Sequence, residues 1–206
     1  IINCAAYTNV DKAESEFKLS NILNFKAVGI ISKWSHDNHK KLIHISTDYV
    51  FDGNSNVPLK EDAITSPLNA YGSSKLDGEI VCLKNDPFSI IIRTSWLYSS
   101  FGNNFVKTMC NLMKKTDSLS VVNDQTGSPT YAADLAITIV KIVNHENWIP
   151  GLYHYSNEGE ITWFEFVNSI KEYIGSNTQI KGISTDNYPT AAKRPRYSLL
   201  DKTKIK

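Results

Sequence analysis

Three short apolar runs, separated by helical stretches, most constrain the fold that this chain can adopt. The runs are Ile1–Cys4, Leu42–Ser46 and Phe88–Thr94, and they are typical of strands buried in a parallel sheet. The stretches between them, at about 21–36 and 69–84, have helical patterns. Regular alternation of strand and helix predicts an α/β fold, a doubly wound parallel sheet with helices on both faces.

After Thr94 the pattern changes to shorter elements that are rich in aromatic residues and proline. Thr162 and Glu165 form a capping-box pattern at the start of one of the helices expected there. The expected elements are helices at 103–115, 132–145 and 163–174 and strands at 119–122 and 152–155. We therefore divide the chain into 1–95, which forms most of the sheet, and 96–206, mainly a smaller α/β domain. The strand at 152–155 is a candidate to return to the first sheet.

The composition excludes several classes of partner. The chain has 22 Lys and Arg against 21 Asp and Glu, so it offers no broad electrostatic attraction to nucleic acid or to a membrane surface. The three cysteines, Cys4, Cys82 and Cys110, are far apart and form no Cys-x-x-Cys pair. This cysteine usage favours a reducing, cytoplasmic location and argues against a disulfide framework or a zinc site.

Tyr71 and Lys75 are the first candidates for chemistry. Their four-residue spacing places them on one face of the expected helix, one turn apart. An ammonium group close to a phenol favours the phenolate, so we expect Lys75 to lower the pKa of Tyr71. Such a tyrosine can exchange a proton with an alcohol or carbonyl oxygen. The pair alone is weak support, because a surface helix with a solvated lysine has the same spacing.

Ser46 and Thr47 end the second apolar run, at the edge of the sheet where α/β enzymes bind their ligands. A hydroxyl from this strand end and the Tyr71–Lys75 pair of the following helix could converge on one carbonyl oxygen. The alternative is that both hydroxyls simply cap a turn.

A series of segments, in order from end to end of the chain, resembles the dTDP-4-dehydrorhamnose reductases, which are extended short-chain dehydrogenase/reductases. The segments are 3–14, 46–53, 71–79, 93–98, 104–106, 123–130, 151–154, 163–166, 188–190 and 194–198. The most specific are Ser-Thr-Asp-Tyr-Val-Phe-Asp-Gly at 46–53 and Asn-Asp-Gln-Thr-Gly-Ser-Pro-Thr at 123–130. The resemblance implies a Rossmann-like fold that binds NADPH or NADH.

The resemblance also implies a reaction, the reduction of the C4 keto group of dTDP-4-dehydro-L-rhamnose to dTDP-L-rhamnose, the last step of dTDP-rhamnose biosynthesis. Tyr71 would be the general acid, Lys75 its neighbour and ribose ligand, and Thr47 the hydroxyl that polarises the carbonyl. The positions that would bind the cofactor are Cys4, Ala5, Ala6, Tyr7, Ser46, Tyr71 and Lys75. Those that would contact the sugar substrate are Asp48, Tyr49, Trp96 and Asn104.

One feature of the family is not found in this sequence. The family begins with a strand, a glycine-rich turn and a helix, but the ten glycines here are too widely spaced to supply that turn. We expect that roughly 60 residues, two strand–helix units, precede Ile1 in the family pattern. We therefore expect these 206 residues alone to bind dinucleotide weakly, to be inactive and to expose a strand edge. The choice between NADH and NADPH cannot be read from this chain.

Two other functions remain open. The same family includes a non-catalytic regulatory subunit of methionine adenosyltransferase, and other members could reduce a different nucleotide-linked 4-keto sugar. A homodimer and a magnesium requirement also stay open, although the sequence offers no set of metal ligands. His36 and His39 are expected on a solvated helix end, and His154 in the core. Arg194 and Arg196 could meet a diphosphate or belong to a solvated tail.

Overall fold

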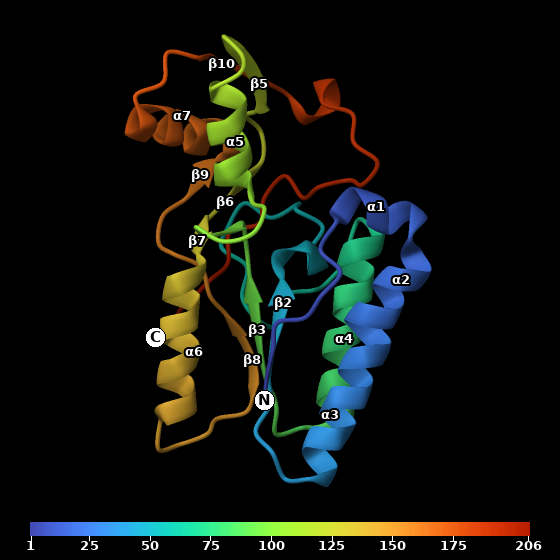
Figure 1. Cartoon of the computed structure of the whole chain (residues 1–206). Coiled ribbons are helices and arrows are strands. Elements are labelled where there is room, and N and C mark those ends of the chain that lie inside the picture. The colour runs from blue at the N-terminus through green and yellow to red at the C-terminus, as the bar shows by residue number, and fades with distance from the viewer.

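The computed structural model describes residues 1–206, which are built around a four-stranded parallel sheet (Figure 1). Its strand order is β1-β2-β3-β8. The strands are β1 (Ile2–Asn3), β2 (Ile43–Thr47), β3 (Ile90–Thr94) and β8 (Gly151–His154). In the register of the sheet Thr47 lies beside Thr94, so the carboxyl ends of β2 and β3 are level. The expected α/β fold with a parallel sheet is confirmed.

Helices cover both faces of this sheet (Figure 1). On one face, α3 (Ala27–Asp37) and α4 (Ala70–Asn85) pack through Val28 and Cys82 against Ile91 of β3. On the other face, α6 (Ala132–Asn144) packs through Leu135 and Ile139 against β2 and β3. The sheet is buried between two apolar layers, which explains why its central strands are continuous apolar runs.

The segment before β2 forms three helical elements that precede α3 and pack along α4. They are α1 (Val10–Ser15), α2 (Phe17–Asn21) and the π-helical turn η1 (Ile22–Lys26). The π turn places Asn24 in the interior, where its amide pairs with both backbone groups of Tyr7 and donates to Ser74 Oγ at 3.0 Å. The expected helix at 21–36 is therefore the end of a longer, irregular helical segment.

The remaining elements form a second group above the carboxyl ends of the sheet strands (Figure 1). They are η2 (Asp48–Val50), β4 (Leu97–Tyr98), α5 (Phe105–Met113), β5 (Ser118–Val122), β6 (Thr126–Gly127), β7 (Thr130–Tyr131), β9 (Ile161–Thr162), α7 (Trp163–Ile174), β10 (Gln179–Ile183) and η3 (Thr185–Asn187). β5 and β10 pair in parallel, and α5 and α7 pack together beside them. The expected capping box of Thr162 and Glu165 is present at the start of α7.

Two elements from the second half of the sequence belong to the main sheet. β8 pairs with β3 at its edge, as expected for the strand at 152–155, and α6 lies on the sheet, which the division at residue 95 did not anticipate. The division itself stays a prediction. No helix is both long and apolar enough to cross a lipid bilayer.

A buried ion pair joins α4 to the centre of the sheet. Glu79 of α4 accepts hydrogen bonds from Arg93 Nε at 2.9 Å and from Arg93 Nη2 at 2.7 Å, and both side chains are 4% exposed. Ser46 of β2 donates to the same carboxylate at 2.5 Å. The guanidinium also lies over the Phe51 ring, 5.0 Å from its centroid. Every charge in this cluster has partners, as burial requires.

We expect Glu79→Ala to lower the free energy of unfolding by about 3–5 kcal/mol, because it leaves Arg93 buried without a counter-charge. Urea denaturation followed by circular dichroism measures this change. The control is Lys33→Ala, which breaks an exposed pair with Asp37 and should cost at most about 1 kcal/mol. Equal losses for the two variants would contradict a special role of the buried pair.

Candidate active site

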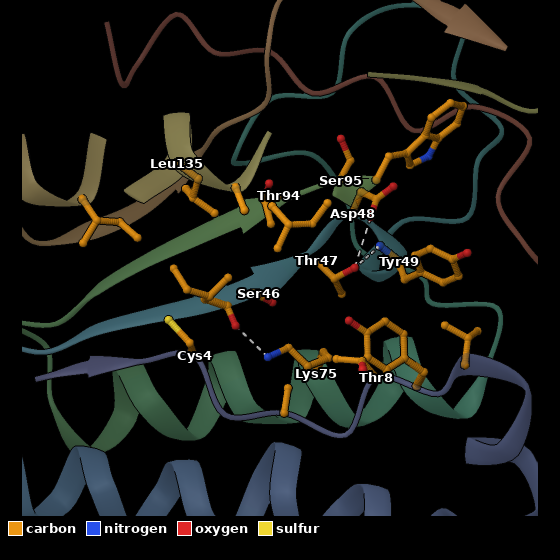
Figure 2. A pocket seen from close by; sticks show the side chains of 18 of the residues that line it. Cys4, Thr8, Ser46, Thr47, Asp48, Tyr49, Lys75, Thr94, Ser95 and Leu135 are labelled. Carbon is orange, nitrogen blue, oxygen red and sulfur yellow. Dashed lines mark hydrogen bonds between the residues drawn. The ribbon is translucent and has the colours of Figure 1, made fainter. Parts of the chain in front are cut away.

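A cavity of about 380 Å³ opens at the carboxyl ends of β2 and β3 (Figure 2). Its walls come from the loop after β1, from the end of β2 with η2, from α4, from the end of β3 and from α6. The lining residues are Cys4, Ala6, Thr8, Val10, Ile45, Ser46, Thr47, Asp48, Tyr49, Tyr71, Lys75, Thr94, Ser95, Trp96, Leu97, Ala132, Leu135, Ala136 and Ile139. This is the position at which parallel α/β sheets bind ligands.

The turn that follows β2 supplies the polar end of the cavity. Thr47 Oγ1 donates to Asp48 Oδ1 at 3.1 Å and accepts from the backbone N–H of Tyr49 at 3.2 Å (Figure 2). Thr47 caps η2, as the turn-capping alternative predicted, and it also lines the cavity. Its hydroxyl is therefore held at a fixed place in the wall.

Tyr71 is buried in the first turn of α4 and lines the same cavity. Burial, and to a smaller extent the Asp48 carboxylate, raise the pKa of Tyr71 to about 12, against the opposing effect of the Thr47 hydroxyl. The expectation that Lys75 lowers this pKa is wrong for this structure. The Lys75 ammonium points to the carbonyl of Ile45 instead, at 2.7 Å, so the phenol gains no stabilising positive charge.

Lys75 lies one helical turn after Tyr71 with its side chain in the wall of the cavity (Figure 2). Only 2% of the residue is exposed. Burial lowers the pKa of Lys75 to about 8, and the Glu79 carboxylate is the main opposing influence. An amine with this pKa changes its protonation state close to neutral pH.

Asp48 is the only acidic side chain among the residues that line the cavity. It is 2% exposed, and its Oδ2 atom has no hydrogen-bond partner. Burial raises the pKa of Asp48 to about 6, although hydrogen bonds from Ser198 and Thr47 favour the carboxylate. Asp48 is therefore a buried acceptor, available to a hydroxyl group of a ligand.

The loop after β1 contributes only part of the expected cofactor positions to the cavity. Cys4 and Ala6 line it, whereas Ala5 and Tyr7 do not. The Tyr7 phenol points away and donates to Glu16 at 2.6 Å. Ser46 lines the cavity, but its hydroxyl is committed to Glu79. Ala5 and Tyr7 could therefore contact a ligand in this cavity only through their backbone atoms.

The two remaining expected substrate contacts differ in their placement. Trp96 lines the cavity and stacks on Trp163 with ring centroids 3.6 Å apart. Gly127 lies directly beside the indole, where a Cβ would be 2.9 Å from its atoms, so this glycine makes room for the stack. Asn104 does not line the cavity, because its side chain caps α5 and donates to the Ser99 carbonyl at 2.7 Å.

Sequence reasoning missed the contribution of α6. Ala132, Leu135, Ala136 and Ile139 form an apolar wall opposite α4. Their spacing of three and four residues marks one face of a helix, but that face alone does not say against which part of the protein it packs. Only the three-dimensional structure shows that this face of α6 lines the cavity.

A second cavity, of about 310 Å³, adjoins the first and shares Tyr49 with it. Its other lining residues are Phe105, Thr108, Met109, Ser120, Val121, Val122, Gln125, Trp163, Tyr188, Thr190 and Arg194. Arg194 is the one cation in this wall, and it pairs with Asp11 of α1 at 2.6 Å. It is therefore part of the site region, not of a solvated tail.

The other basic candidates lie outside both cavities. His154 is fully buried and pairs with the Leu59 carbonyl at 3.0 Å, as expected of a core residue. His36 and His39 are exposed, although His36 lies 3.7 Å from the buried Asp86. Arg196 pairs with the exposed Asp186 at 3.3 Å.

The cavity residues suit one end of a nicotinamide cofactor. Cys4, Ala6, Ala132 and Ala136 are small and leave a slot between the β1 loop and α6, with the Lys75 amine at its side. Small side chains and one buried amine fit a flat ring and a ribose that carries hydroxyl groups. No group of three or more His, Cys, Asp or Glu side chains is arranged to hold a metal ion.

Comparison with known proteins places this geometry in a family. The family model described as the RmlD substrate binding domain matches residues 1–206. A dTDP-4-dehydrorhamnose reductase from Aggregatibacter actinomycetemcomitans is 42% identical over all of this chain and 73% of its own length. A dTDP-4-keto-6-deoxy-D-glucose reductase from Streptomyces niveus is 37% identical over 97% of this chain and 69% of its own length.

A solved structure gives the same result. The dTDP-4-dehydrorhamnose reductase from Bacillus anthracis, in complex with NADP, has a TM-score of 0.96 and 42% sequence identity to this chain. The match covers 100% of this chain and 72% of that enzyme. At this similarity the backbone of the cavity is shared with a protein whose structure holds a dinucleotide.

The environment of Asp48 predicts a pH-dependent stability. Its pKa rises on folding from 3.8 to about 6, so the native state binds the proton more tightly than the unfolded state and loses stability as the pH rises through that range. An asparagine at this position cannot titrate in this way, so we compare the free energy of unfolding of Asp48→Asn with that of the original protein. We expect this difference to shift in favour of the variant by about 2–3 kcal/mol from pH 4 to pH 7.5. Denaturation at the two pH values measures the difference, with the exposed Asp62→Asn as the control. The same difference in stability between the two proteins at both pH values would contradict the raised pKa.

Proposed function

The chain belongs to the RmlD family of dTDP-4-dehydrorhamnose reductases, and we propose that it forms the carbonyl-reducing site of such an enzyme. The substrate we propose is dTDP-4-dehydro-L-rhamnose, which is reduced at C4 to dTDP-L-rhamnose with NADPH or NADH. The observation that carries the proposal is the convergence of Thr47, Tyr71 and Lys75 on one cavity, from β2 and α4.

Tyr71 is the proton donor of the proposed reaction. Its pKa of about 12 keeps the phenol protonated at neutral pH, so the proton is present when the reaction starts. As the carbonyl oxygen of the substrate gains negative charge, it becomes a strong acceptor for that proton. The bound dinucleotide supplies the hydride to the carbonyl carbon.

Thr47 and Lys75 assist this transfer from two sides. The Thr47 hydroxyl is fixed by its contacts with Asp48 and with the backbone of Tyr49, and it can turn its hydrogen to the carbonyl oxygen. Lys75 places a positive charge in the same wall at neutral pH, where its ammonium group can bind the hydroxyl groups of the cofactor ribose. The free Oδ2 of Asp48 accepts a hydroxyl group of the sugar.

The second cavity suits the nucleotide part of the substrate. Phe105, Tyr49, Trp163 and Tyr188 supply aromatic faces for a base, and Arg194 matches the oxygens of a diphosphate. Because Tyr49 belongs to both cavities, a nucleotide sugar can extend from one into the other. The proposed orientation places the sugar next to Thr47 and the base next to Trp163.

A different 4-keto sugar is the second candidate substrate. The Streptomyces niveus relative is named for dTDP-4-keto-6-deoxy-D-glucose and is 37% identical to this chain. Both sugars have a C4 keto group and a dTDP anchor, so the residues described above serve either one. The comparison of the two substrates in one assay decides between them.

The test is oxidation of NADPH, followed by absorbance, with each dTDP-4-keto sugar and the protein in its natural length. We expect Tyr71→Phe to lower turnover by about 10²–10⁴-fold, because it removes only the proton donor, and to leave dinucleotide binding unchanged. Tyr173→Phe, at a phenol that is 93% exposed, is the control and should be fully active.

Two outcomes would overturn the proposal. Near-normal turnover of Tyr71→Phe would show that another group is the acid. Dinucleotide binding by the unaltered protein without reduction of either sugar would instead support the non-catalytic, regulatory function that is also found in this family.

A further inference from the structure

A chain of three polar contacts leads from the loop after β1 to the Lys75 amine. Asn3 Oδ1 accepts the backbone N–H of Ala5 at 3.2 Å, and Asn3 Nδ2 lies 3.1 Å from His44 Nδ1. On the other side of the imidazole, His44 Nε2 lies 3.4 Å from Lys75 Nζ. Asn3, His44 and Lys75 are all buried, so water does not compete for these contacts.

These contacts determine which ring nitrogen of His44 carries the hydrogen. The Ala5 N–H needs a hydrogen-bond acceptor, and in the Asn3 side chain only the Oδ1 atom can accept. The NH2 group of the Asn3 amide therefore faces His44 Nδ1. Nδ1 must then accept, and the hydrogen of the neutral ring is on Nε2. His44 stays neutral at all ordinary pH values, since burial and the charge of Lys75 lower its pKa to about 3.

The Nε2–H group of His44 therefore faces Lys75. An amine nitrogen accepts this hydrogen, whereas an ammonium group has no lone pair and is repelled. Lys75 Nζ also donates to the Ile45 carbonyl at 2.7 Å, which both protonation states can do. The contact with His44 thus distinguishes the two states and favours the neutral amine.

We propose that Asn3 and His44 are positioning residues that act through Lys75: by fixing the Nε2–H tautomer, they make Lys75 release its proton more readily. Neither residue reaches the reacting atoms, so neither is catalytic itself. The effect on the reaction rests on the proposed function, but the tautomer and the titration of Lys75 do not.

Other ionisable groups around Lys75 also affect its charge. Glu79 and Cys82 on α4, and Cys4 on the β1 loop, favour the ammonium form when they are ionised, while burial disfavours it. The Asn3 backbone carbonyl is the competing partner of the His44 ring, and it favours a hydrogen on the ring nitrogen nearest to it. If that carbonyl prevailed over the Asn3 side chain, Nδ1 would carry the hydrogen and Nε2 would accept from the ammonium.

The first experiment reads the tautomer directly. The protein is labelled with nitrogen-15 histidine, and His44→Gln assigns the resonances of His44. We expect the hydrogen on Nε2 and a neutral ring from pH 5 to 9, with a change in the Nε2–H signal only where Lys75 titrates, near pH 8. An Nδ1–H signal, or protonation of the ring itself near neutral pH, would overturn the proposal.

The second experiment follows the ε-carbon of Lys75 by NMR as the pH is raised. Asn3→Asp supplies oxygens to both Ala5 and His44, which moves the hydrogen to Nδ1, and Asn3→Ala removes the amide without adding charge. We expect both variants to raise the midpoint of Lys75, Asn3→Asp by about one pH unit or more, a tenfold change in proton affinity. Asn9→Ala, which loses only the cap of α1, should leave the midpoint unchanged.

The outcomes separate the proposal from its alternatives. A shift in Asn3→Asp but not in Asn3→Ala would show an effect of the added charge alone and would overturn the role of the tautomer. Where the protein reduces its substrate, the alkaline limb of turnover should move upward with the Lys75 midpoint in Asn3→Asp. If the Lys75 midpoint shifts and the alkaline limb of turnover does not, the link to catalysis is overturned. Absence of turnover in the unaltered protein would contradict only the proposed function.

Discussion

The buried pair of Glu79 and Arg93 is the interaction on which the site depends. It connects α4, which carries Tyr71 and Lys75, to β3, and through Ser46 to β2, which carries Thr47. Arg93 also approaches the Glu61 carbonyl and His154 of β8, each at 3.4 Å. Removal of either charge would leave its partner in a low-dielectric interior, so the helix and the strands are held in one relative position.

Two glycines make this position of α4 possible, and they restrict it further. A side chain at Gly72 would meet the carbonyl oxygen of Tyr49, and one at Gly78 would meet that of Asn24. The helix therefore lies directly against the backbone of η2 and of the π turn. Together with the ion pair, these contacts fix α4 near both ends of the segment that carries Tyr71 and Lys75. The wall of the cavity formed by α4 is rigid, whereas Ala5 and Thr8 on the opposite loop are exposed.

The sequence was sufficient for features that depend on local patterns. The apolar runs predicted β2 and β3, the Thr162–Glu165 spacing predicted the start of α7, and the strand end predicted Thr47 in the cavity wall. Features that depend on the direction of a side chain were not accessible. The spacing of Tyr71 and Lys75 placed them on one face, but the ammonium turns to the Ile45 carbonyl, and Asn104 turns to cap its own helix.

Burial explains why this cavity is chemically distinct from the rest of the surface. It raises the pKa of Asp48 and of Tyr71 and lowers that of Lys75, so each of the three groups is shifted toward its neutral form. Because the cavity is poorly solvated, its groups respond strongly to any charge that develops there. Of the three, Tyr71 is protonated throughout the physiological range, while Asp48 and Lys75 have pKa values on either side of neutrality. Tyr71 therefore keeps its proton across this range, and a change of pH alters the charge of Asp48 and Lys75 instead.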